Sequence, residues 1–179
     1  RDFNAAGIPR AYLRRLQDEG LLVRMGRGLY QLADAEWSES HSLAEAARAV
    51  PHGVICLLSA LRFHELTTQL PHQVWMLIGH KKWAPKNPPV SLRIIRATGD
   101  ALTAGVERHT IEQVEVPITN PAKTVADCFK YRSQVGLDVA IEALRDCLRS
   151  RRATVDDIWH FAAIDRVQNV MRPYIEATV

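Results

Sequence analysis

The stretch that decides the fold is IPRAYLRRLQDEGLLVRMGRGLYQL, residues 8–32. Its first half, residues 8–19, predicts a short helix, because Pro9 suits a first helical turn, where its missing N–H is not needed. Gly20 follows where a helix C-terminus favours a residue that tolerates positive φ. The buried side of this helix is expected from three side chains at helical spacing, Tyr12, Leu13 and Leu16.

The second half of the stretch predicts a β-hairpin. Apolar runs at residues 21–25 and 29–32 flank Gly26-Arg27-Gly28, and two such runs around a glycine-containing connection are typical of a hairpin. A helix followed directly by a hairpin is the plan of a winged helix-turn-helix. The preceding helix of the pair would be residues 2–6, with Gly7 as the turn. Such a domain needs one more supporting helix, so we expect a helix to precede Arg1.

Arginines are concentrated in this unit. Arg10 and Arg14 are one turn apart on the expected helix and therefore share a face. This suits a recognition helix, since arginine can bind a guanine edge in a bidentate way or hold a phosphate. The plainer alternative is a solvated basic helix followed by an ordinary turn. We expect DNA contacts from six residues: Arg10, Ala11, Arg14, Arg15, Arg24 and Arg27.

The composition narrows the class of protein. With 179 residues, of which 47% are hydrophobic, the chain can form one ordinary domain or two small ones around a real core. The net charge of +3 permits nucleic-acid binding without demanding it. The cysteines at 56, 128 and 147 have no paired spacing and are expected to be buried thiols in a reducing compartment. We find no membrane-length apolar run and no signal-peptide pattern, so we expect a cytoplasmic protein.

The rest of the chain predicts a second, α+β part. Residues 33–40 read as a polar linker, with Trp37 as a packing anchor. Strands are expected at residues 73–78, 90–97, 106–111 and 114–119, in a small, mostly antiparallel sheet. Helices are expected at 41–50, within 54–66 (whose first residues could form a strand), and at 120–132, 137–149, 155–164 and 168–177. The helix at 137–149 should bury Leu137, Ile141, Leu144 and Leu148, and Thr154 with Asp157 resembles a capping box.

Several stretches resemble a known family. They are GIPRAYLRRL (7–16), LVRMGRGLYQL (22–32), LSALRFHELTTQLPHQVWMLI (58–78) and, most specifically, NPAKTVADCFKYRSQVGLDVAIEALRD (120–146). Over nearly its whole length the chain resembles the AbiEi-type antitoxins. These are the transcriptional regulators of type IV toxin–antitoxin operons, which act in abortive infection and phage defence.

The resemblance implies a function. It implies a repressor that binds inverted repeats in double-stranded operator DNA at the promoter of its own operon. It also implies that the protein counters a toxin with a nucleotidyltransferase fold, without the need for a stable complex, and that the C-terminal domain serves this second role. A toxin-binding module without a DNA-binding role is the main alternative.

Two polar segments leave alternatives open. Lys123, Asp127 and Lys130 fall on one face of the expected helix, so Lys123 can pair with Asp127 within the helix while its neighbours pack inside. Alternatively, this face and Arg132 contact a partner or nucleic acid. The segment HKKWAPKNPP, residues 80–89, cannot be regular because of its prolines. Its Lys81 and Lys82 could touch phosphate, although we favour a solvated loop with Trp83 tucked down.

Enzymatic alternatives find weaker support. The sequence has no GxSxG elbow around Ser59 or Cys128 and no phosphate-binding loop. A nuclease would need clustered carboxylates for Mg²⁺. Glu112, Glu115 and Asp127 are present, but the Glu-x-Lys strand is missing. None of the seven histidines has the spacing of a metal site: His41, His52, His64, His72, His80, His109 and His160.

We therefore predict an α+β protein of two domains. Residues 1–33 would form the winged helix-turn-helix, and residues 41–179 an α+β antitoxin domain with a small sheet packed with helices. Enzymatic activity, a metal and a cofactor are not expected.

Overall fold

The computed structural model describes residues 10–19, 21–26, 29–32 and 39–178. Contacts divide the chain into two compact units, residues 1–37 and 38–179. The helix predicted at residues 2–6, its turn at Gly7 and the proposed anchor Trp37 lie outside the described residues.

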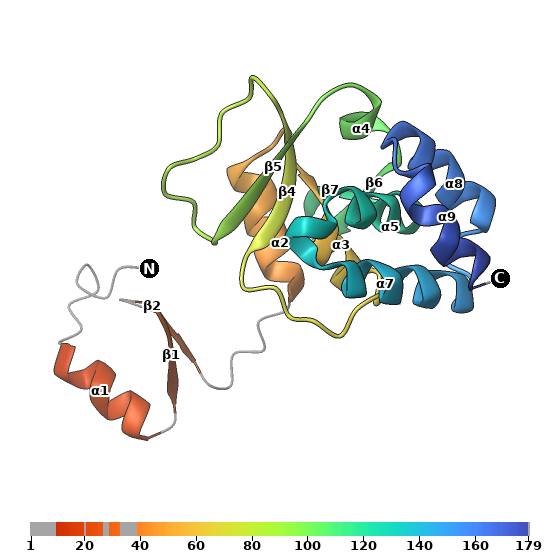
Figure 1. The fold of residues 1–179 in the computed structure, drawn as a ribbon. Helices are drawn as coiled ribbons and strands as arrows, with labels where there is room; N and C mark the ends of the chain where they lie inside the picture. Colours follow the sequence, from red (N-terminus) through yellow and green to blue (C-terminus); the bar gives the residue numbers. More distant parts are fainter. Residues whose placement is uncertain (1–9, 20, 27–28, 33–38, 179) are drawn as a thin grey trace. The chain divides into compact units, whose positions relative to one another are not determined.

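The first unit contains one helix and one hairpin within its described residues (Figure 1). Helix α1 spans Arg10–Asp18, and strands β1 (Leu22–Gly26) and β2 (Leu29–Leu32) pair antiparallel. The predicted helix and hairpin are therefore confirmed. Tyr12, however, is 51% exposed, so its assignment to the buried side is wrong. Its ring lies on the exposed face, one turn from Arg15, whose guanidinium is 6.0 Å from the ring centroid.

The second unit contains a five-stranded mixed sheet in the order β5-β4-β3-β7-β6 (Figure 1). The strands are β3 (Val54–Ile55), β4 (Val74–Gly79), β5 (Leu92–Ala97), β6 (Val106–Ile111) and β7 (Val114–Thr119). The pairs β4/β5 and β3/β7 are parallel, while β3/β4 and β6/β7 are antiparallel. The prediction of a mostly antiparallel sheet is therefore wrong. The connection at residues 80–91 carries the chain back so that β5 runs alongside β4 in the same direction.

Helices α2 to α9 belong to the second unit. They are α2 (Glu39–Ala49), α3 (Leu57–Phe63), α4 (Asp100–Thr103), α5 (Pro121–Lys130), α6 (Arg132–Val135), α7 (Leu137–Arg149), α8 (Val155–Ile164) and α9 (Gln168–Glu176). Helix α2 begins two residues before its predicted start. For residues 54–66 the sequence allowed a strand at the start of the expected helix, and the structure has a short strand followed by a helix. The short helices α4 and α6 were not predicted.

The central strands β3 and β4 are buried on both faces of the sheet. Along β4, Val74, Met76 and Ile78 pack in the cluster that contains α2, as the two-residue period of a strand requires. The alternate residues Trp75 and Leu77 face the other cluster, formed with α3, α5 and α7 to α9. Helix α2 therefore covers one face of the sheet and the remaining long helices cover the other.

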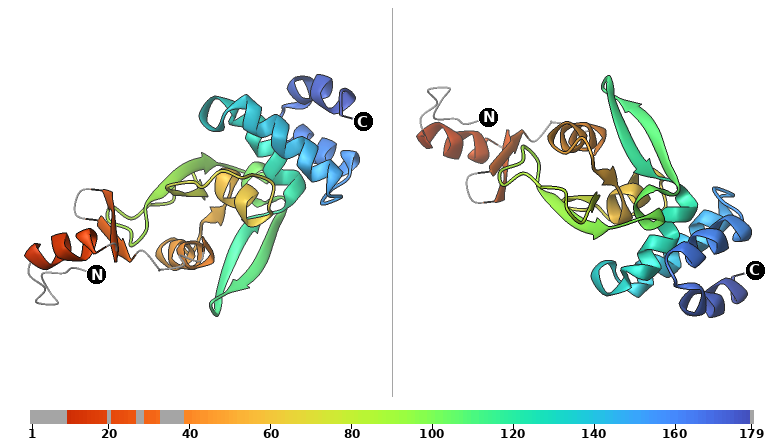
Figure 2. Two further views of the ribbon diagram at one scale, coloured as in Figure 1. Left: turned by 90° about the horizontal axis from the view of Figure 1, so that it is seen from below. Right: turned by 90° about the horizontal axis from the view of Figure 1, so that it is seen from above.

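Local sequence signals fix several element ends. The Asn120 side chain accepts a hydrogen bond of 2.8 Å from the Lys123 N–H and caps α5. The predicted capping box of Thr154 and Asp157 opens α8 and is confirmed. In the β6–β7 hairpin, which projects from the helices in Figure 2, the turn residues Glu112 and Gln113 have φ values of 49° and 64°. Positive φ at both positions is the pattern of a type I′ turn, which fits the twist of a hairpin.

The buried face of α7 differs from the prediction. Leu144 is buried, but Leu137 is 36% exposed, and Ile141 and Leu148 are only partly covered. The residues that face the core are Val139, Ala140, Ala143, Leu144 and Cys147. Small side chains at Ala140 and Ala143 let α7 approach α5 closely, so Leu137, Ile141 and Leu148 lie at the edge of the contact.

Candidate nucleic-acid interface

Helix α1 presents two exposed guanidinium groups, those of Arg14 and Arg15. The Nε atom of Arg15 lies 2.8 Å from a carboxylate oxygen of Glu19, one turn further along the chain. This exposed ion pair and the nearby Tyr12 ring orient Arg15 along the helix. Arg14, by contrast, projects from the helix as an exposed cation.

The other residues predicted to bind DNA are placed only in part. Arg10 is the first residue of α1, so it lies one turn from Arg14 on a continuous helix and the two share a face. Arg24 is in β1, paired with Tyr30 of β2. The side chains of Arg10, Ala11 and Arg24, and the whole of Arg27, lie outside what the structure describes.

The loop between β4 and β5 forms a second cationic surface. Lys81, Lys82 and Lys86 are exposed, and Trp83 is 62% exposed. The expectation that Trp83 is tucked down is therefore wrong. The reason lies in the backbone, because Arg96 donates hydrogen bonds to the carbonyl oxygens of Gly79, His80 and Lys82 at 3.0, 2.8 and 2.8 Å. These bonds hold the loop in a shape that leaves the indole outside.

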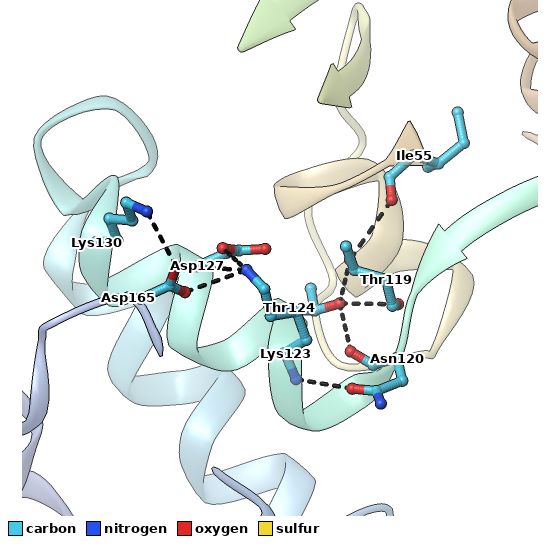
Figure 3. Close-up of polar contacts among 8 residues, drawn as sticks. All are labelled: Ile55, Thr119, Asn120, Lys123, Thr124, Asp127, Lys130 and Asp165. Atoms are coloured by element: carbon cyan, nitrogen blue, oxygen red, sulfur yellow. Dashed lines mark hydrogen bonds and ion pairs between the residues drawn. The ribbon is translucent and has the colours of Figure 1, made fainter. Parts of the chain in front are cut away.

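The segment at 120–132 forms a buried ionic cluster (Figure 3). Lys123 pairs with Asp127 one turn along α5, as predicted, but neither side chain is on the surface. Its Nζ atom also lies 3.2 Å from Asp165, which follows α8, and Lys130 lies 3.0 Å from the other oxygen of that carboxylate. The suggestion that Lys123 contacts a partner or nucleic acid is thus wrong, because its side chain has no exposed surface.

Burial sets the electrostatics of this ionic cluster. Burial raises the pKa of the Asp127 carboxyl, and the adjacent Lys123 ammonium opposes that shift. For Lys123, burial alone would lower the pKa, but Asp127 and Asp165 outweigh it and the pKa is raised. One oxygen of Asp127, Oδ2, is buried without a hydrogen-bond partner among the described residues. The side chains are therefore strongly interdependent and act as an internal link between α5 and α8.

Lys130 and Arg132 lie at the edge of this cluster. The Lys130 side chain is 29% exposed and its Nζ atom is 5.6 Å from the centroid of the Tyr131 ring. Arg132 is exposed, and its guanidinium donates a hydrogen bond of 2.9 Å to the carbonyl oxygen of Phe129. Both cations serve the local structure first, although each keeps some contact with solvent.

Groups considered for catalysis are dispersed or already engaged. Glu112 pairs with His41, Glu115 with Arg108, and Asp127 is buried in α5, so they do not form one site. Within the described part of the chain, no group of three or more His, Cys, Asp or Glu residues could hold a metal ion. The described cysteines are buried and free, and burial raises the pKa of Cys56 and Cys128, which disfavours the reactive thiolate.

Three structurally important residues were missed from the sequence. Asp165 completes the ionic cluster, Arg96 holds the β4–β5 loop, and His52 bonds to the carbonyl oxygen of Trp83 at 3.0 Å. Asp165 is 42 positions from Lys123, so no local spacing could have joined them. Arg96 alternates with apolar residues in its strand. This pattern predicts that its side chain is exposed, but it does not predict which carbonyl oxygens the guanidinium binds.

No helix among the described residues has the length and apolarity needed to cross a membrane.

Comparison with known protein families indicates the class of protein to which the N-terminal stretch is similar. Residues 1–33, the stretch that contains α1 and the β1–β2 hairpin, match the family described as "Transcriptional regulator, AbiEi antitoxin". The resemblance to this family of regulators is confirmed over these residues.

A solved structure supports the fold of a longer stretch. The chain is similar to the RV2827C protein from Mycobacterium tuberculosis, with a TM-score of 0.52 and 14% sequence identity. The match covers 89% of this chain and 62% of the M. tuberculosis chain, so this chain spans less than two thirds of that protein's length. At this identity the likeness concerns the fold. A search of curated proteins gives no match.

Proposed function

We propose that this protein is an antitoxin that acts as a DNA-binding transcriptional regulator. The observation that carries the proposal is the coincidence of two features in residues 1–33. The stretch matches a family of transcriptional regulators, and its described part forms a helix with exposed Arg14 followed by an antiparallel hairpin. A helix and adjoining hairpin are the parts that a winged helix-turn-helix places against duplex DNA.

In this proposal the helix reads sequence and the hairpin holds the backbone. Arg10 and Arg14, with Ala11 between them, enter the major groove, where arginine binds guanine O6 and N7. Arg15, Arg24 and Arg27 contact phosphates on either side and fix the position of the helix. The DNA-binding domain would comprise residues 1–33, and its operator would contain inverted repeats, with one copy of the protein on each half.

The second unit is proposed to carry the antitoxin function. Residues 41–179 would counter a partner toxin with a nucleotidyltransferase fold, in the manner of a type IV system, in which a stable complex is not required. Supporting this proposal, the unit has its own hydrophobic core on either side of the central strands and an internal ionic cluster.

The experiment that tests regulation is binding to the DNA upstream of the gene. Fluorescence anisotropy with the full chain should give tight binding to that DNA and weaker binding to a shuffled duplex. A specific site binds typically about 10³–10⁷ times more tightly than non-specific DNA at physiological salt. Equal affinity for both duplexes would contradict a sequence-specific regulator.

The antitoxin role is tested separately by co-expression with the neighbouring gene product. Suppression of toxicity without co-purification would support the indirect route. Co-purification combined with no operator binding would favour the alternative of a toxin-binding module without a DNA-binding role. A nuclease is tested by incubating the chain with Mg²⁺ and DNA or RNA, and we expect intact nucleic acid.

A further inference from the structure

The loop between β4 and β5 has a charge pattern that the proposed operator contact does not use. Residues 79–99 contain Lys81, Lys82, Lys86, Arg93 and Arg96 and have no Asp or Glu. The three lysines are exposed and flank an exposed tryptophan in the sequence. We define the loop surface as Lys81, Lys82, Trp83 and Lys86. It lies in the second unit, residues 38–179, and so belongs to a different part of the chain from α1.

The loop surface is held in place from two sides. Arg96 binds three successive parts of the loop through the carbonyl oxygens of Gly79, His80 and Lys82. From α2's side, His52 Nε2 donates to the carbonyl oxygen of Trp83 at 3.0 Å. Pro85, Pro88 and Pro89 further restrict the backbone that follows. The lysines and the indole are therefore presented on a preformed backbone, which reduces the entropy lost on binding.

The exposure of Trp83 needs an explanation, because an indole ring in water lacks the favourable free energy that comes from burying its apolar surface. Trp75, a few residues earlier, is only 6% exposed, whereas Trp83 is 62% exposed. Within the part of the chain that the structure describes, the His52 ring lies 6.0 Å from the Trp83 ring and is tilted by 60°, so the indole is not stacked on it. An exposed aromatic ring among cations is the arrangement with which proteins stack an unpaired base while binding the neighbouring phosphates.

We propose that the loop surface binds single-stranded nucleic acid. Trp83 stacks on one unpaired base, and Lys81, Lys82 and Lys86 bind the adjoining phosphates. An acidic protein is the competing partner, but the cores of protein interfaces are depleted in lysine and enriched in arginine. Three lysines around one tryptophan suit a phosphate chain with accessible bases better. The proposal does not depend on operator binding by α1.

The test uses the full chain and a fluorescently labelled oligothymidine, with anisotropy measured over a range of salt concentrations. Trp83→Ala should weaken binding about 5- to 150-fold, because one stacked base is lost. Trp83→Phe keeps an aromatic face and should retain most of the affinity. Lys81→Ala with Lys82→Ala should reduce the slope of log affinity against log salt by about 1.4, at about 0.7 for each phosphate contact on a single strand.

Two controls make the outcome decisive. Arg149→Ala removes an exposed cation at the end of α7 and should leave binding unchanged. The circular dichroism spectrum of every variant should match that of the unmodified chain. Operator affinity, measured on duplex DNA, reports α1 independently. If Trp83→Ala and the double lysine variant bind oligothymidine as the unmodified chain does, the proposal is wrong. It is also wrong if polyglutamate displaces the oligonucleotide at equal charge concentration, which would indicate a surface for acidic proteins.

Discussion

The ammonium group of Lys123 lies 3.2 Å from a carboxylate oxygen of Asp165, and both side chains are completely buried. This pair joins α5 to the residue that follows α8. Asp127 completes the buried part of the cluster, and the partly exposed Lys130 pairs with Asp165 at its edge. The segment NPAKTVADCFK, the most distinctive part of the sequence, thus serves to connect helices.

Removing Lys123 should destabilise the second unit severely. Lys123→Ala leaves Asp127 and Asp165 buried without their shared cation, and breaking a buried ion pair in this way costs about 3–5 kcal/mol. Urea titration followed by circular dichroism measures the free energy of unfolding. Arg149→Ala, which breaks the exposed pair with Asp146, is the control and should change stability by less than about 1 kcal/mol. Equal effects of the two substitutions would contradict a structural role for the cluster.

Stability should fall on acidification through His64. Burial lowers the pKa of His64 below 6.5, while its Nε2 atom bonds to the carbonyl oxygen of Thr119 at 2.7 Å. Because the folded pKa lies below the unfolded value, the unfolded chain binds the proton more readily. The contribution of neutral His64 is therefore complete above pH 6.5 and is lost as the pH falls below that value.

His64→Gln tests this pH dependence, because glutamine does not titrate and keeps a hydrogen-bond donor. The free energy of unfolding should be measured from about pH 7.5 to about pH 5, the range in which histidine changes charge. The unmodified chain should lose more stability than the variant on acidification. An identical loss in both proteins would show that His64 does not contribute.

The N-terminus of α8 should depend on its capping box. Thr154 Oγ1 accepts a hydrogen bond of 3.1 Å from the Asp157 N–H, and the Asp157 carboxylate accepts one of 2.9 Å from the Thr154 N–H. Thr154→Ala should cost about 1 kcal/mol, whereas Thr154→Ser, which keeps the hydroxyl, should cost much less. Thermal unfolding of both variants measures the difference. Equal melting temperatures for the alanine and serine variants would argue against the cap.

Much of the fold could be predicted where the signal is local. The hairpin at 106–111 and 114–119, helix 137–149 and the Thr154 cap follow from period, glycine or capping residues and are confirmed. Strand direction could not be predicted in this way, because the parallel β4/β5 pair depends on how residues 80–91 return. Burial of Lys123 also escaped prediction, because its partner Asp165 is distant in sequence.

The candidate site was predictable to a different degree in each unit. The residues of α1 and its hairpin follow from helical spacing and glycine placement. The exposure of Trp83 could not be predicted from the sequence. It depends on hydrogen bonds from Arg96 in β5 to three carbonyl oxygens at the end of β4 and in the loop that follows it. Long-range polar contacts of this kind leave no periodic pattern in the sequence.

The most direct measurement for the central claim is the dissociation constant of Arg14→Ala for the DNA upstream of the gene. Arg14 is exposed on α1, and loss of a base contact should cost about 1–3 kcal/mol and relax specificity at one operator position. Arg149→Ala, measured at the same salt concentration, should bind like the unmodified chain. Weaker, less specific binding by Arg14→Ala alone is the predicted result. Unchanged affinity and specificity of Arg14→Ala would contradict a recognition role for α1.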